Sequence, residues 1–330
     1  MAYFLSGDIG GTKTLLQLNT AVERVPLLQK SYASADYAGL PDMLDAFVAE
    51  AGVSNIAAAC FALAGPVSGR LVKLTNLPWA VDADELVNRY CIRHVALIND
   101  FEAVGHGIAA LQATDLLTLQ EGSAQAEGTR LVLGAGTGLG VAWLSSQQGA
   151  YQVHPSEGGH MDFAPADEMQ YLLLRYLQHR HGHVSYERIV SGPGLISIYE
   201  FMRETGFASP SPQMLAALDE EDAAAVITRF SRHGEEPIAR MVVDMFMSVY
   251  GAFAGNMALA SLPRGGIYVA GGIAAKIAMQ MQRGEFMDAF LSKGRFGELL
   301  ATLPVRIVLN TDAGLMGANL IAQRHAKITL

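Results

Sequence analysis

GDIGGTKT, residues 7–14, follows a short apolar run at residues 3–5 and leads into TLLQLNT, residues 14–20. Both flanking segments have strand-like patterns, so the stretch predicts a strand, a tight glycine turn and a second strand. It nearly matches the phosphate loop GxxxxGK[ST], but Thr12 stands where the second glycine is required and no helix pattern follows. A Walker-type loop is therefore excluded. Two interpretations remain: a plain hairpin, and a hairpin whose backbone N–H groups bind phosphate.

A second glycine turn has the same surroundings. GAGTGLG, residues 134–140, lies between LVL and VAWL, so the pattern at residue 5 recurs at residue 131 as a faint internal duplication. The dinucleotide fingerprint GxGxxG fails here, because Leu139 takes the place of the last glycine and a strand pattern follows. Two such hairpins, together with a strand that ends in Gly271-Gly272 before a helix, favour phosphate binding over plain turns.

Composition narrows the class of protein. With 330 residues, 51% of them hydrophobic and 17% charged, the chain predicts two globular domains of ~150 residues each. The net charge of −9 comes without a basic stripe, so neither nucleic acid nor a membrane is expected as a partner. Cys60 and Cys91 form no CxxC pair, and we expect both to be buried as small hydrophobic residues. No signal-peptide pattern is present, which favours a soluble cytoplasmic protein.

Strand and helix patterns alternate along the chain, which indicates an α/β architecture. Strands are expected at residues 56–63, 95–98, 267–270 and 305–309, and helices at 40–51, at 101–111 and from about Asp312. Residues 245–263 carry no charge but include polar residues, so we expect a buried helix there and not a membrane span.

Two of the expected helices are rich in small residues, one around residues 103–110 and the other around residues 251–258. Glycine inside a helix costs ~1 kcal/mol, so it calls for a packing reason. The two helices could cross closely at a hinge between lobes, or each could be a separately packed core helix.

Asn99-Asp100 follows a buried strand, at the end of the strand where open α/β sheets bind ligands. Asp100 could therefore act as a base, or it could cap the helix that follows. A second polar cluster is HPSEGGHMDF, residues 154–163. Its Glu157-x-x-His160 spacing suits a metal, but the two glycines between them disfavour the helix that such a pair requires. Glu157, His160 and Glu187 are residue types that bind sugar hydroxyls, although surface or capping roles are the alternative for each.

Taken together, these pieces resemble bacterial glucokinases, within the hexokinase, actin and heat-shock-70 ATPase superfamily. The matching segments are GDIGGT, LTNLPW, LINDFEAVGHG, LVLGAGTGLG, HPSEGGHMDFAP, YERIVSGPGL, YVAGGI and FMDAFLSKGRF, in family order from Gly7 to Phe296. The related ROK sugar kinases and repressors carry a cysteine-rich zinc motif beside an ExGH-like element. Both cysteines lie upstream of His160, which points to the zinc-free branch, and no helix-turn-helix domain is expected.

The resemblance implies a two-lobed actin-like ATPase fold with a ribonuclease-H-like sheet in each lobe and the active site in the interlobe cleft. Because the last helix returns to the first lobe in this family, we expect a smaller N-terminal α/β lobe of residues 1–110 plus 301–330. Residues 111–300 would then form a larger α+β lobe.

The resemblance also implies the site. Glucose is expected to bind Asn99, Asp100, Glu157, His160 and Glu187, with Asp100 as the catalytic base. The ATP phosphates would contact Gly7, Asp8, Ile9, Gly10, Gly11, Thr12, Thr137 and Gly138, while Gly271 and Gly272 flank the adenosine. Asp8 would hold Mg²⁺ through water.

The expected reaction transfers the γ-phosphoryl group of ATP to the 6-hydroxyl of D-glucose, giving glucose 6-phosphate and ADP, the first step of glycolysis. Family members are typically homodimers. A kinase for another hexose, polyphosphate as the donor, and a non-catalytic sugar or nucleotide sensor remain as alternatives.

Overall fold

The structure is a computed structural model that describes residues 2–20, 26–74, 77–232 and 236–327; residues 75–76 of the LTNLPW segment lie outside these ranges. The chain divides into two compact units, unit 1 with Met1–Gln112 and Asp312–Leu330, and unit 2 with Ala113–Thr311. The division differs from the expected boundary at residue 301. Strand β13 (Val305–Val308) pairs with β12 (Gly266–Ala270) and β8 (Leu116–Gln120), so residues 301–311 stay with unit 2.

Unit 1 contains a five-stranded sheet in the order β3 (Leu28–Ala33), β2 (Lys13–Thr20), β1 (Tyr3–Ile9), β4 (Ile56–Leu63), β7 (His94–Asn99). The first three strands run antiparallel, whereas β1, β4 and β7 run parallel. The strand expected at residues 3–5 extends to Ile9, because β1 pairs along its whole length with both β2 and β4. Asp8 is therefore part of a strand and not of a loop.

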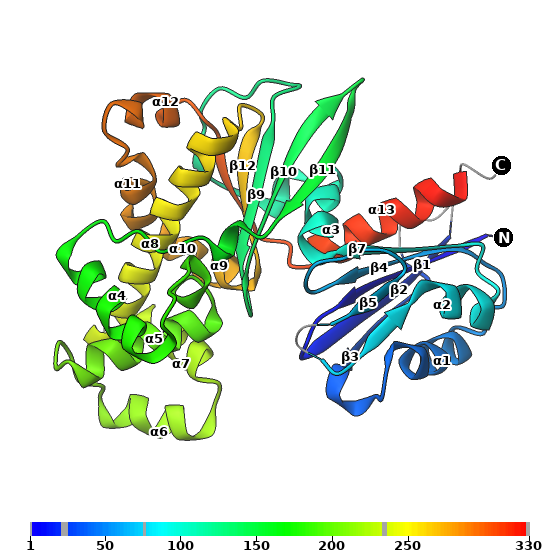
Figure 1. Cartoon of the computed structure of the whole chain (residues 1–330), viewed down its shortest axis with the longest axis horizontal. Helices are drawn as coiled ribbons and strands as arrows, with labels where there is room; N and C mark the ends of the chain where they lie inside the picture. Colours follow the sequence, from blue (N-terminus) through cyan, green and yellow to red (C-terminus); the bar gives the residue numbers. More distant parts are fainter. Residues whose placement is uncertain (1, 21–25, 75–76, 233–235, 328–330) are drawn as a thin grey trace. The chain divides into compact units, whose positions relative to one another are not determined.

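Helices cover both faces of this sheet (Figure 1). One face packs against α1 (Leu40–Ala51) and α2 (Ala83–Tyr90), whose apolar residues join the main core of unit 1. The other face packs against α13 (Ala313–Lys327), and α3 (Asp100–Gly107) packs on α13. A small sheet of β5 (Leu71–Lys73) and β6 (Ala80–Asp82) and the 3-10 turns η1 (Ser34–Asp36) and η2 (Ile108–Ala110) complete the unit.

Unit 2 repeats the strand order of unit 1. Its sheet runs β11 (Ala150–Ser156), β10 (Leu139–Gln147), β9 (Arg130–Ala135), β12, β13, with β8 added at the edge. Again the first three strands are antiparallel and the central three are parallel. The duplication predicted from residues 5 and 131 is confirmed, and each unit carries one ribonuclease-H-like sheet.

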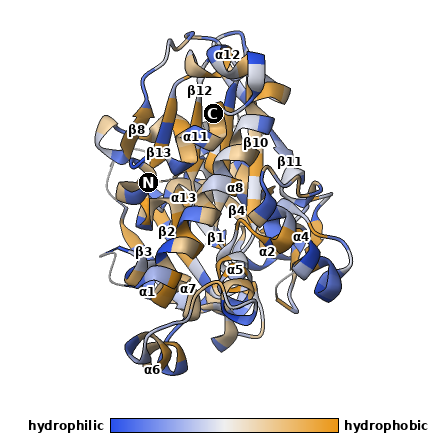
Figure 2. Cartoon of the chain, turned by 90° about the vertical axis from the view of Figure 1, so that its left-hand side faces the viewer, coloured by the Kyte–Doolittle hydropathy of each residue, from blue (hydrophilic) through white to orange (hydrophobic). Residues whose placement is uncertain are grey.

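The helices of unit 2 pack around α8 (Pro237–Ser261), which lies in the core with most of its residues buried. The helix has the length and apolarity of a membrane span, yet 78% of its most apolar window is buried inside the protein, so the predicted buried helix is confirmed. Helix α6 (Pro212–Glu220) carries both hydrophilic and hydrophobic residues, as its mixed colouring in Figure 2 shows. The remaining elements are η3 (Ala113–Asp115), η4 (Gly158–His160), α4 (Glu168–His181), η5 (Tyr186–Arg188), α5 (Gly192–Glu204), α7 (Ala223–Ser231), α9 (Gly272–Lys276), α10 (Ala278–Met281), α11 (Glu285–Leu291), η6 (Gly294–Phe296) and α12 (Gly297–Ala301).

The small residues of α3 and α8 serve packing inside each unit. A Cβ added at Gly107 of α3 would overlap the carbonyl oxygen of Ala313 in α13, and one added at Gly251 of α8 would overlap that of Phe286 in α11. Each of these glycines thus has a packing reason inside its own unit.

The two cysteines differ in environment. Cys60 is buried in β4 on the sheet face covered by α13, as expected. Cys91 is exposed, because it ends α2 in a left-handed conformation with φ 52° that turns it away from the core. The prediction that Cys91 is buried was wrong.

Candidate active site

The first glycine hairpin is held in shape from outside. Gly10 N–H donates to Lys13 O at 3.1 Å, which closes the turn between β1 and β2. Ser34 of η1 clamps this turn: its hydroxyl donates to Gly10 O at 2.8 Å, and its N–H donates to Thr12 O at 3.0 Å. Thr14 Oγ1 lies 3.0 Å from the Ser34 hydroxyl. These hydrogen bonds hold the hairpin in shape. The contribution of Ser34 to them was not predicted from the sequence.

Asp8 lies at the carboxyl end of β1, beside the first turn of α13. A Cβ added at Gly314 would lie 3.3 Å from Asp8 Oδ2, so the carboxylate rests against the helix backbone. Burial, and then the Asp312 carboxylate, raise the pKa of Asp8 from 3.8 to about 6, and the Lys13 ammonium offsets part of this shift.

A cation beside Asp8 would relieve the repulsion between the two carboxylates, so the local charge fits Mg²⁺. Within the described residues, no group of three or more His, Cys, Asp or Glu side chains is placed to hold a metal. An ion at Asp8 would therefore keep water and phosphate oxygens among its ligands, as Mg²⁺ commonly does.

Asn99 and Asp100 lie where β7 passes into α3. Asn99 is the cap of this helix, since its Oδ1 accepts hydrogen bonds from Phe101 N–H at 2.9 Å and Glu102 N–H at 3.1 Å. Its Nδ2 donates to Gly65 O at 3.0 Å. Phe101 N–H also donates to Asp100 Oδ1 at 2.9 Å, so the carboxylate considered as a cap shares this donor with Asn99. Asp100 is the first helical residue and is partly buried at the mouth of the parallel strand.

In unit 2, Glu187 comes together with Glu157 and His160, which lie much earlier in the sequence. His160 Nε2 lies 3.8 Å from Glu157 Oε2, and His160 Nδ1 lies 3.8 Å from Glu187 Oε1. Tyr186 N–H donates to Met161 O at 3.0 Å, which joins the η4 and η5 segments that carry these side chains. Glu157 and His160 are well exposed, whereas the Glu187 side chain is 31% exposed. The cluster presents donors and acceptors of the kind that bind a sugar.

This sugar-type cluster is fastened to the second glycine hairpin. Glu187 Oε2 accepts a hydrogen bond from Leu139 N–H at 2.8 Å, and a Cβ added at Gly138 would lie 2.5 Å from the same oxygen. The turn itself is closed by Gly136 N–H, which donates to Gly138 O at 2.8 Å. Gly138 is therefore required by the close approach of a carboxylate, a reason that the sequence alone did not give.

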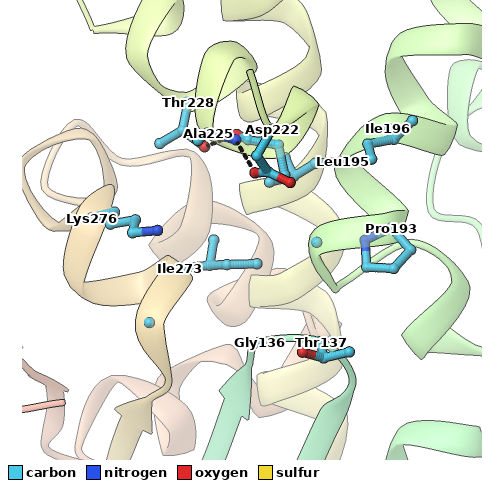
Figure 3. A pocket seen from close by; sticks show the side chains of 13 residues that line it. Gly136, Thr137, Pro193, Leu195, Ile196, Asp222, Ala225, Thr228, Ile273 and Lys276 are labelled. Atoms are coloured by element: carbon cyan, nitrogen blue, oxygen red, sulfur yellow. Dashed lines mark hydrogen bonds between the residues drawn. The ribbon is translucent and has the colours of Figure 1, made fainter. Parts of the chain in front are cut away.

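A pocket of about 400 Å³ is lined by Gly136 and Thr137 of this hairpin (Figure 3). Asp222 caps α7, with its Oδ2 accepting Ala225 N–H at 2.8 Å, and Lys276 reaches toward the pocket from the opposite wall. Thr137 and Gly272 line it, whereas Gly271 does not; a Cβ at Gly271 would collide with Ala135 O. The full lining is Gly136, Thr137, Gly192, Pro193, Leu195, Ile196, Asp222, Ala224, Ala225, Thr228, Gly272, Ile273 and Lys276.

The predicted site residues thus fall into two groups. Unit 1 holds the first hairpin with Asp8, Asn99 and Asp100, while unit 2 holds the second hairpin, the sugar-type cluster and the pocket. The pocket walls contributed by α5 and α7 were missed. The only local signal for them was the capping pattern of Asp222, which the sequence analysis treated as part of an exposed acidic run.

Known proteins match this chain along almost its whole length. A family model described as Glucokinase matches residues 5–325. A glucokinase from a Nostoc species is 43% identical, over 98% of this chain and 100% of the relative. A glucokinase from a Synechocystis species is 42% identical, over 97% of each.

Solved structures show the same fold. A glucokinase from an Antarctic psychrotroph superimposes with a TM-score of 0.81 and 28% identity, covering 98% of this chain and 99% of the other. A Balamuthia mandrillaris glucokinase solved in complex with glucose gives a TM-score of 0.83 at 23% identity, over 98% and 94%. A ROK family glucokinase from Streptomyces griseus, in complex with glucose and AMPPNP, gives 0.67 at 20% identity, over 98% and 99%.

Proposed function

The chain belongs to the glucokinase family, and from this premise we propose its reaction and the residues that carry it. It is an ATP-dependent hexose kinase that transfers the γ-phosphoryl group of ATP to the 6-hydroxyl of D-glucose, giving glucose 6-phosphate and ADP. The observation that carries the proposal is the hydrogen bond from Leu139 N–H to Glu187. Through it, a side chain suited to sugar hydroxyls and a hairpin suited to phosphate share one rigid connection.

Glucose is held by its hydroxyl groups. Glu157 and Glu187 accept hydrogen bonds from hydroxyl groups, and His160, which lies between them, can donate or accept. Asn99 already uses its Oδ1 and one N–H within the protein, so it offers its remaining N–H to the sugar. These contacts orient the 6-hydroxyl for transfer, which is most of what an enzyme contributes to phosphoryl transfer.

Asp100 accepts the proton of the 6-hydroxyl group while the oxygen of that hydroxyl group, O6, attacks the γ-phosphorus. One bond forms between O6 and phosphorus, the bond from phosphorus to the oxygen that bridges to the β-phosphate breaks, and ADP leaves with that oxygen. Asp100 Oδ1 also accepts Phe101 N–H, but Asn99 accepts the same N–H and that of Glu102, so α3 keeps its cap when Asp100 takes the proton.

The triphosphate is bound by the backbone N–H groups of the two hairpins, at Gly11-Thr12 and at Thr137-Gly138. The pocket beside the second hairpin takes the nucleoside, with apolar walls for the base and Asp222, Thr228 and Lys276 for polar groups. Asp8 would hold Mg²⁺ through water, and the ion would supply charge that neutralises the phosphates.

The cellular setting is proposed on the family likeness. The protein acts in the cytoplasm, where it catalyses the first step of glycolysis, and it forms a homodimer. Neither nucleic acid nor a membrane is proposed as a partner, in keeping with the net charge of −9.

A panel of substrates tests the proposal. ADP release from ATP is measured with glucose, fructose, mannose and N-acetylglucosamine, and glucose 6-phosphate formation is measured with ATP or polyphosphate as donor. We expect glucose and ATP to give the highest kcat/KM. A higher kcat/KM with another hexose would reassign the substrate, and glucose binding without ADP release would make the protein a sensor.

A further inference from the structure

Helices α3 and α13 of unit 1 touch backbone to backbone (Figure 1). A Cβ added at Gly107 would overlap Ala313 O, and one added at Gly317 would overlap Ala103 O and lie 2.8 Å from Gly107 N. All four of these residues are buried. The two helices therefore approach as closely as backbones can, and glycine is required at both crossing points.

Each of the two helices carries part of the proposed chemistry. Asp100 is the first residue of α3, and Val104 lies one turn further along the same face. A Cβ added at Gly314 in α13 would lie 3.7 Å from Val104 Cγ2 and 3.3 Å from Asp8 Oδ2. The helix with the base and the strand with the phosphate-side carboxylate thus meet at the first turn of α13.

We propose that Gly107 and Gly317 are positioning residues, which set the separation of Asp100 from Asp8 by fixing how closely α3 approaches α13. This rests on the proposed function, in which Asp100 takes the sugar proton and Asp8 serves the phosphate side. A side chain at either glycine has to push the helices apart, since its Cβ would lie 1.8–1.9 Å from a carbonyl oxygen where ordinary contact is 3.4–4 Å. A misplacement of only about 1 Å can lower turnover about 100-fold.

The test replaces each glycine by alanine and compares kcat with KM. For Gly107→Ala and Gly317→Ala we expect kcat to fall roughly 10- to 100-fold. KM for glucose should change less than kcat, because three of the proposed glucose-binding side chains, Glu157, His160 and Glu187, lie in unit 2 and are not displaced. A purely structural role would lower the melting temperature without this division between kcat and KM.

Gly128→Ala is the matched control. A Cβ at Gly128 would lie 2.5 Å from Gly265 N, which is the same kind of backbone crowding, but before the start of β9 and not at its hairpin end. We expect all three variants to melt roughly 2–10 °C below the parent. Only the control should keep kcat within about twofold of the parent, since its crowding lies away from α3 and α13.

The kinetic results can support or overturn the inference in the following ways. If Gly107→Ala and Gly317→Ala keep kcat within about twofold, as the control does, the inference is overturned. If neither folds, Gly314→Ala replaces them, because its Cβ would meet Asp8 at 3.3 Å and requires only a small shift. A lowered kcat with an unchanged glucose KM then supports the proposal, and unchanged kinetics overturn it. Asp100→Asn is measured in parallel: if that variant keeps its turnover, the proposed function itself fails, whatever the glycine variants do.

Discussion

Asn99 Oδ1 accepts the backbone N–H of Phe101 at 2.9 Å and so caps the helix on which Asp100 is the first residue. Asn and Asp are about equally good capping residues, so the sequence could not tell which of the two neighbours did this work. Since Asn99 does it, substitution of Asp100 tests its chemistry without removing the helix cap.

We predict that Asp100→Asn lowers kcat about 10²- to 10⁴-fold, the usual contribution of a general base. The glucose dissociation constant, measured by calorimetry, should stay within ~3-fold because the other proposed hydroxyl-binding side chains remain. Two variants of Asn99 serve as controls for the helix cap. Asn99→Asp keeps a capping side chain, whereas Asn99→Ala removes it and should lower the free energy of unfolding by ~1 kcal/mol. Near-normal turnover of Asp100→Asn would remove Asp100 from its proposed role.

The two glutamates beside His160 should differ in their effect on ATP. Glu187 binds both the sugar-type cluster and Leu139 N–H, whereas Glu157 contacts only the cluster among the described interactions. Glu157→Gln should therefore raise KM for glucose roughly 10-fold and leave KM for ATP within about twofold. Glu187→Gln should raise both, because a neutral amide is a weaker acceptor for the hairpin N–H. Equal ATP KM values in the two variants would count against a coupling through Leu139.

The pocket beside Thr137 predicts a nucleoside site with Asp222 in its wall. Asp222→Asn keeps a capping side chain on α7 but removes the charge that faces the pocket, so KM for ATP should rise ~5-fold or more with KM for glucose unchanged. Asp167→Asn is the matched control, since Asp167 caps α4 by accepting Gln170 N–H at 2.8 Å and does not line the pocket. If both variants behave like the parent, the nucleoside binds elsewhere.

Asp8 predicts a dependence on pH. Its pKa is raised from 3.8 to about 6, so the folded state disfavours the ionised carboxyl. The contribution of this group to folding stability is therefore fully present below pH 3.8 and is lost as the pH rises through about 6. In the absence of Mg²⁺, Asp8→Asn should melt above the parent at pH 7 and level with it at pH 4.

Activity should follow the opposite course, because the ionised carboxylate is the form that holds a cation. The kcat/KM for Mg-ATP should fall as the pH drops below about 6, and added Mg²⁺ should move the midpoint to lower pH by competing with the proton. A midpoint that ignores the Mg²⁺ concentration would contradict the role of Asp8.

Local patterns predicted the repeated hairpins because the strand alternation and the glycine turns are both read within a few residues. The helices α1 and α8 were predicted for the same reason, because the apolar residues of each lie within one short stretch of sequence. The Glu157–His160–Glu187 cluster was expected from residue type and family likeness, and its geometry depends on the contact between η4 and η5.

The features that the sequence analysis missed depend on contacts between residues that are far apart in the sequence. Ser34 reaches the first hairpin across more than twenty residues, and the pocket is assembled from α5, α7 and α9. The boundary near residue 301 was misplaced because β13 pairs with β12 and with β8, the latter nearly two hundred residues earlier, and these pairings keep that strand in unit 2. No periodicity in the sequence records such a pairing.

The contrast between Cys60, sealed beneath α13, and Cys91, at the exposed end of α2, gives the unmodified chain one thiol that a maleimide dye can reach. Both cysteines lie in unit 1. Labelling the wild-type protein therefore attaches a single fluorophore to that unit without mutagenesis, and its emission on adding sugar or nucleotide would report how unit 1 responds to each.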